Sequence, residues 1–155
     1  MTLPLSAYLD LEPRVLAWAA GQGWQLQRTG PLRRGEWPLP RLEFLREGVL
    51  TPGEWDAALT ACPLFMELVS GKREARSREG IGVKFYQAPT ESLGFAQIAH
   101  TGPAEFVAAC RRLPGWDQVP ASDETAAFAR VGLPCVPPSQ RNPEVFTMLA
   151  GVPGD

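Results

Sequence analysis

Two expected strands are joined by the segment Thr29-Gly-Pro-Leu-Arg-Arg-Gly35-Glu-Trp-Pro-Leu-Pro-Arg-Leu-Glu43. Its glycines and prolines indicate a turn, and its paired arginines can hold the oxygens of a phosphate. The turn leads into a short alternating stretch, in which Arg41 and Glu43 share one face because side chains of a strand alternate. The segment is therefore suited to holding phosphate beside a strand-borne acid, although a cation stands next to that acid.

Hydrophobic alternation and helix-capping signals outward from this segment predict an α+β fold. Thr51-Pro-Gly-Glu54 is a capping box with Pro at the first helical position, which predicts a helix over 52–61. We expect further helices at 12–20, 104–113 and 122–130, strands at 24–29, 41–45, 64–69, 73–78, 81–87 and 92–99, and an extended piece at 116–119. This order predicts a sheet domain over 1–100, a small helical subdomain over 101–141 and a tail over 142–155.

Composition and charge limit the functions open to the chain. Its 155 residues suit one domain, and 45% hydrophobic residues can fill a core. Fifteen Lys and Arg stand against 17 Asp and Glu, giving a formal charge of −2. Dedicated DNA-binding domains are usually basic, so a nucleic-acid role must rest on a local patch.

The cysteines and the single histidine do not predict a metal site. Cys62, Cys110 and Cys135 are far apart, form no Cys-x-x-Cys pair, and are expected to be buried free thiols. The first residues lack the pattern of a signal peptide, and no apolar run reaches the ~20 residues that span a bilayer. We therefore expect a cytoplasmic protein without a membrane partner.

Several motifs in register resemble the palm and thumb of X-family DNA polymerases, the family of polymerase beta, over about residues 10–141. Gly30-Pro-Leu-Arg-Arg-Gly35 resembles the Gly-Ser-x-Arg-Arg-Gly loop of that family. The stretch from Val83 to Thr101-Gly102 resembles the strand pair that ends in Tyr-Phe-Thr-Gly-Ser. Asp123-Glu124 through Gly132-Leu-Pro-Cys-Val-Pro-Pro138 resembles the end of the bacterial thumb. The resemblance implies a nucleotidyltransferase-like palm followed by a thumb-like subdomain.

The catalytic positions that the resemblance implies are degenerate. Members of the family hold two Mg²⁺ ions with three aspartates, and these fall on Arg41, Glu43 and Lys84. Two of the three are cations, so polymerase chemistry is not expected and no cofactor is implied. The positions that bind the nucleotide in the family are better preserved in this sequence than the catalytic positions. The candidates for phosphate or nucleotide are Gly30, Arg33, Arg34, Thr101 and Gly102, and those for DNA are Arg111 and Arg112.

Each candidate also has a purely structural interpretation. Arg33 and Arg34 suit a solvated turn, and His100 suits packing or capping. Arg41 and Lys84 suit cross-strand ion pairs with Glu43, worth about 0.2–1 kcal/mol each. Arg111 and Arg112 can stabilise a helix end. A solvated hairpin is expected of Lys72, Arg73, Arg76 and Arg78, and a nucleic-acid patch is the alternative for them.

Three functions follow as hypotheses. The first is a catalytically inactive X-family-like binding or accessory module, whose partner is DNA, a nucleotide, or a repair or replication protein. The second is an active nucleotidyltransferase with a rearranged site that uses Glu43 and requires Mg²⁺. The third is a protein–protein interaction module without DNA binding.

Overall fold

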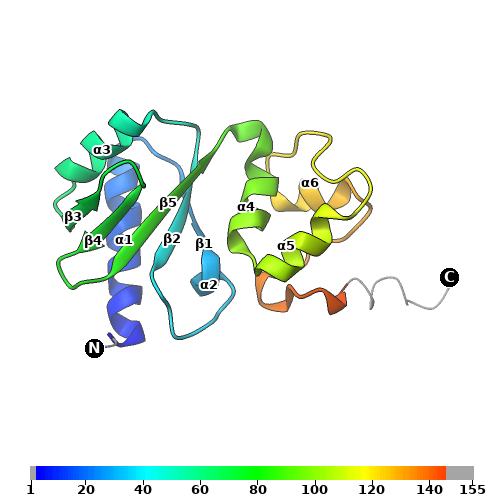
Figure 1. Cartoon of the computed structure of the whole chain (residues 1–155), viewed down its shortest axis with the longest axis horizontal. Helices are drawn as coiled ribbons and strands as arrows, with labels where there is room; N and C mark the ends of the chain where they lie inside the picture. Colours follow the sequence, from blue (N-terminus) through cyan, green and yellow to red (C-terminus); the bar gives the residue numbers. More distant parts are fainter. Residues whose placement is uncertain (1–2, 146–155) are drawn as a thin grey trace.

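The computed structural model describes residues 3–145 and has an α+β fold, as the sequence predicts. Five strands form one mixed sheet in the order β1-β2-β5-β4-β3, and helices flank it (Figure 1). The elements are, in order, α1 (Leu5–Gly21), β1 (Leu26–Thr29), α2 (Gly30–Arg33), β2 (Leu42–Glu47), α3 (Pro52–Ala61), β3 (Phe65–Val69), β4 (Glu74–Ser77), β5 (Gly82–Ala88), η1 (Thr90–Ser92), α4 (Leu93–Thr101), α5 (Ala104–Arg111), α6 (Glu124–Ala129) and η2 (Pro138–Gln140).

The central pair of strands, β2 and β5, runs parallel, and the other neighbours are antiparallel. Glu43 stands opposite Lys84 in this parallel pair, and Phe44 stands opposite Phe85. Because side chains alternate along a strand, the two phenylalanines point to one face and the two charged residues to the other. The register thus gives the sheet one apolar and one polar face.

The main core lies on the apolar face. Helices α1 and α3 cover it, with Leu11, Val15 and Trp55 packed against Phe44 and Phe85, all fully or almost fully buried. The predicted capping box is present at the start of α3, where Thr51 and Glu54 bond each other's backbone N–H groups. This cap satisfies helix N–H groups that would otherwise have no partner.

Helices α4, α5 and α6 pack together beside the sheet, next to α2 (Figure 1). Ile98, Phe106 and Phe128 form the centre of this second cluster and are fully buried. Helix α4 also contacts the sheet, where its Leu93 packs on Leu45. It therefore belongs to both clusters and joins the helices to the sheet.

Four local predictions were wrong. The strand expected at 92–99 is η1 followed by α4, because its buried residues Leu93, Gln97, Ile98 and Thr101 recur with a helical spacing. The helix expected at 12–20 begins at Leu5, so Pro13 lies inside α1. Residues 116–119 form turns rather than an extended piece.

The fourth wrong prediction concerns the cysteines. Cys62 and Cys110 are buried free thiols as expected, but Cys135 is exposed. Of the predicted tail, residues 146–155 lie outside the described part. No helix within 3–145 is long and apolar enough to cross a bilayer.

Candidate functional site

The start of the segment predicted as a turn is the short helix α2, and it is held tightly against β2. Gly30 has a φ of +74°, and a Cβ there would lie 2.8 Å from Cδ of Glu43. Only glycine tolerates both the left-handed backbone and this close approach. The sequence thus places α2 directly beside the carboxylate of Glu43.

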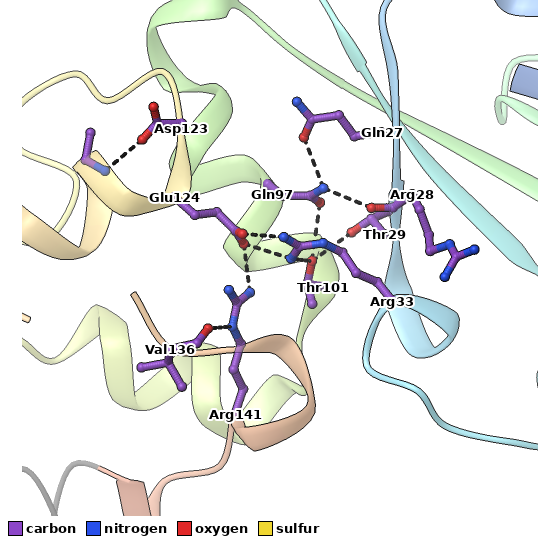
Figure 2. A network of polar contacts seen from close by, with 11 residues as sticks. Gln27, Arg28, Thr29, Arg33, Gln97, Thr101, Asp123, Glu124, Val136 and Arg141 are labelled. Atoms are coloured by element: carbon purple, nitrogen blue, oxygen red, sulfur yellow. Dashed lines mark hydrogen bonds and ion pairs between the residues drawn. The ribbon is translucent and has the colours of Figure 1, made fainter. Parts of the chain in front are cut away.

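Arg33, the last residue of α2, points to the other helices rather than to solvent (Figure 2). Its guanidinium forms a bidentate ion pair with Glu124 of α6, in which Nη1 donates to Oε2 at 2.9 Å, and the same Nη1 donates to Thr101 Oγ1 at 2.8 Å. Arg141 Nη1 also donates to Glu124 Oε2, at 2.7 Å, and its side chain is completely buried. We call Arg33, Glu124 and Arg141 the buried ion triad.

Two opposing effects act on the pKa of Glu124. Burial is the largest and raises it, but the hydrogen bonds and charges of Arg33 and Arg141 together outweigh burial and leave the pKa below its usual value. Glu124 is therefore ionised at neutral pH, and the triad carries a net charge of +1.

Thr101 is buried within a second set of hydrogen bonds (Figure 2). Its hydroxyl bonds to Thr29 Oγ1 at 3.2 Å and to Gln97 Oε1 at 3.3 Å. Gln97 in turn donates to the carbonyl oxygen of Arg28 at 2.9 Å. The polar groups of two predicted phosphate ligands, Arg33 and Thr101, are thus used to join the sheet edge to α4.

Arg34 is placed differently. Its Nη1 lies 2.5 Å from Glu36, and its side chain is 16% exposed. Its buried Nε has no hydrogen-bond partner among residues 3–145. Gly102, with a φ of +70°, lies beside it, since a Cβ there would be 4.0 Å from Arg34 Nε. These two predicted residues therefore meet, and one buried donor is left unpaired.

Arg41, Glu43 and Lys84, the positions to which the resemblance assigns the catalytic aspartates, lie together on the polar face of the sheet, with two neighbours from β4 and the turn before it. We call this set the charged face: Arg41, Glu43, Arg73, Glu74 and Lys84. Arg41 lies 3.8 Å from Glu43 and 3.5 Å from Glu74, while Lys84 lies 3.6 Å from Glu74. The expected pair of Arg41 with Glu43 is present, but Lys84 pairs with Glu74 rather than with Glu43. Glu74 is nearer because β4 also adjoins β5, with Glu74 opposite Lys84.

Cations outnumber acids on the charged face by three to two. Burial lowers the pKa of Lys84, Glu74 raises it, and the positive charges of Arg73 and Arg41 lower it further, so that it ends below its usual value. Lys84 Nζ also donates to the carbonyl oxygen of Lys72 at 2.5 Å. The repulsion among these cations would be relieved by a bound anion.

An aromatic stack borders the charged face. Tyr86 and His100 lie parallel, with ring centroids 3.9 Å apart, and Tyr86 donates to Glu43 at 2.9 Å. Burial, followed by the charges of Arg73, Lys84 and Arg111, lowers the pKa of His100 to about 4. The imidazole is therefore neutral at pH 7. Arg111 of α5 lies within electrostatic reach of this stack, because its charge acts on His100. Arg111 and Arg112 are both exposed at the end of α5.

Within residues 3–145 there is no group of three or more His, Cys, Asp and Glu side chains that could hold a metal ion. Glu43 is flanked by Arg41, and a fixed cation a few ångströms away opposes a divalent ion by several kcal/mol at an intermediate dielectric. The arrangement at Glu43 therefore does not fit a two-metal centre. No protein-family model matches the chain, and no curated protein matches it.

Sequence reasoning missed several residues that build the site. Tyr86 follows Lys84 by two positions on one strand, so the period of the strand could have placed it on the same face. Glu74 required the pairing of β4 with β5, and the same pairing brings Arg73, already named among the hairpin cations, to the charged face. Glu124 lies 91 residues from its partner Arg33, and Arg141 lies 17 residues from Glu124. No local pattern carries such distant contacts.

Proposed function

We propose that the chain is a binding module that holds phosphate groups of DNA or a nucleotide on the charged face and lacks nucleotidyl-transfer activity. The observation that carries the proposal is the excess of cations at the family's metal-binding positions. The α+β fold and the resemblance to an X-family palm and thumb support a role as an inactive accessory protein in DNA repair or replication.

The charges favour direct contact with phosphate over contact through a metal. Arg41, Arg73 and Lys84 can each donate to phosphate oxygens, and Arg111 adds a fourth cation from α5. With Glu43 and Glu74, the net charge of this region is +2 if Arg111 is included. A divalent ion is therefore not needed to make the surface attractive to an anion.

Fluorescence anisotropy with labelled single-stranded, gapped and duplex DNA tests the proposal. We expect binding at 50 mM salt that is the same with Mg²⁺ and with EDTA. Neutralising three phosphates on a single strand predicts a salt slope near −2, so affinity should fall about 20-fold between 50 and 200 mM salt.

The matched variants are Lys84→Gln and Arg14→Gln. Lys84 lies on the charged face, whereas Arg14 lies on α1, which covers the opposite face of the sheet. We expect only Lys84→Gln to weaken binding and flatten the salt slope. Equal effects of the two variants, or no binding at low salt, would contradict the proposal, and Mg²⁺-dependent transfer of a nucleotide would support the enzyme hypothesis instead.

A protein-interaction module is the second candidate, and the edge strand β3 favours it. Met66 and Val69 on this strand are 64% and 50% exposed. An exposed strand edge with apolar side chains can pair with a strand of another protein. Met66→Lys should abolish such an association and leave DNA binding unchanged, as measured by sedimentation and anisotropy respectively.

A further inference from the structure

A cavity of about 520 Å³ lies among α4, α5 and the turns at 116–120. This volume is within the range usual for small-molecule sites. Its lining includes Phe95, Ala99, Val107, Arg111, Trp116 and Gln118. None of the positions predicted from the sequence lies in it except Arg111.

One side of the cavity is apolar and aromatic. Phe95 and Trp116 meet edge to face with ring centroids 4.9 Å apart, and Trp116 is almost fully buried against Phe128. Ala99 and Val107 also line the cavity beside this aromatic pair. Such a side suits a flat, uncharged ring, because packing its face against Phe95 removes apolar surface from water.

The lining of the cavity contains both acidic and basic side chains. Glu91 and Asp117 are acidic and would repel a phosphate inside the cavity. Arg111 is the only cation among the lining residues, and it also acts on His100, as do Lys84 and Arg73 of the charged face. A ligand that enters beside Arg111 could thus place its uncharged part in the cavity and its phosphates toward the charged face.

We infer that this cavity receives one unpaired nucleobase of a single-stranded nucleic acid whose phosphates contact Arg111 and the charged face. Gln118 and Ser92 donate to the carbonyl oxygens of Trp116 and Pro89 at 3.4 and 3.5 Å, and their side-chain oxygens can accept from the edge of the base. The inference rests on the proposed function, because the charged face must bind the phosphates. It goes further in naming the site and class of the group that is read.

Binding of two single strands of equal length distinguishes the base from the phosphates. The probes are labelled dT8 and a chain of eight abasic deoxyribose phosphates, both without Mg²⁺. Stacking of one base in the cavity should make dT8 bind about tenfold more tightly than the abasic chain.

Filling the cavity should remove this preference. Ala99→Leu and Ala96→Leu place a larger side chain in the lining, whereas Ala108→Leu makes the same change at an exposed position of α5. We expect either filling variant to bind dT8 as weakly as the abasic chain, with abasic affinity unchanged. Ala108→Leu should retain the full preference, and circular dichroism checks that each variant is folded.

The other outcomes decide against the inference. Equal wild-type affinity for the two chains, or a preference that persists in the folded filling variants, overturns the base site and leaves the proposed function intact. No binding of either chain overturns both. Saturable binding of N-acetylphenylalanine amide that the filling variants lose, without any dT8 preference, assigns the cavity to a protein side chain and also overturns the inference.

Discussion

The most informative perturbation of the fold is Glu124→Gln, which removes the single negative charge from the buried ion triad and nearly preserves the volume. Glu124 is 11% exposed, and its two partners, Arg33 and Arg141, are 22% and 0% exposed. A glutamine keeps one acceptor oxygen but turns an NH₂ group toward the guanidinium group of Arg33. Arg141 would then carry a fully buried charge with no acid to balance it.

The expected loss of stability follows from this burial. Breaking one buried pair by removing a partner costs about 3–5 kcal/mol. The remaining oxygen of Gln and the partial exposure of Arg33 favour the lower end, so we expect about 3 kcal/mol. Domains are stable by only ~5–15 kcal/mol, and for a chain of this length the loss corresponds to a fall in Tm of roughly 6–12 °C.

Urea unfolding at pH 7, followed by far-UV circular dichroism, measures the change. The matched control is Glu67→Gln, because Glu67 and its partner Arg76 lie 3.7 Å apart with side chains 71% and 58% exposed. That exposed pair should contribute less than about 0.5 kcal/mol. If Glu124→Gln costs no more than Glu67→Gln, the triad does not stabilise the fold and the reasoning is refuted.

Two further predictions concern α4. His100 has a folded pKa of about 4, below the ordinary 6.5, so the unfolded chain binds more protons between these values and stability falls as pH drops. With allowance for solvent screening, His100 should make the free energy of unfolding about 1–2 kcal/mol lower at pH 5 than at pH 7.5. His100→Phe should remove this contribution to the pH dependence. A variant with the same pH profile as the wild type would contradict the prediction. Gly94→Ala should destabilise by roughly 1–3 kcal/mol, since a Cβ there would lie 2.2 Å from the carbonyl oxygen of Asp123. Gly53→Ala is its control, because a Cβ at Gly53 meets nothing within 4 Å and should be neutral or mildly stabilising in urea unfolding; equal effects would mean that α4 moves aside freely.

The sequence predicted those elements whose signals are local. The capping box at Thr51 and the alternation in β5 both depend on residues a few positions apart. Helix α4 was predicted as a strand because two of its sides are apolar. Leu93 and Ile98 lie on the buried side, and Phe95 and Ala99 lie on the side that lines the cavity. When two sides of a helix are apolar, the helical period is obscured.

The candidate site was predictable as a set of positions but not as a set of contacts. Arg41 and Glu43 were expected to share a face, and they do, because a strand has a fixed period. The direction of Arg33 could not be predicted, because it depends on an acid 91 residues away that only the packing of α6 brings near. A pair of arginines in a turn is compatible with solvent, a ligand or an ion pair, and tertiary structure selects among them.

Helix α4 connects the features on which both proposals depend. Three consecutive residues at its end face different directions, since each step along a helix turns it by about 100°. Ala99 lines the cavity, His100 stacks on Tyr86 beside the charged face, and Thr101 bonds with Arg33 of the buried ion triad. A shift or rotation of α4 would therefore alter the cavity and the charged face together. The buried ion triad thus has a consequence beyond stability: it fixes the helix whose position sets the spacing between the proposed phosphate contacts and the proposed base site.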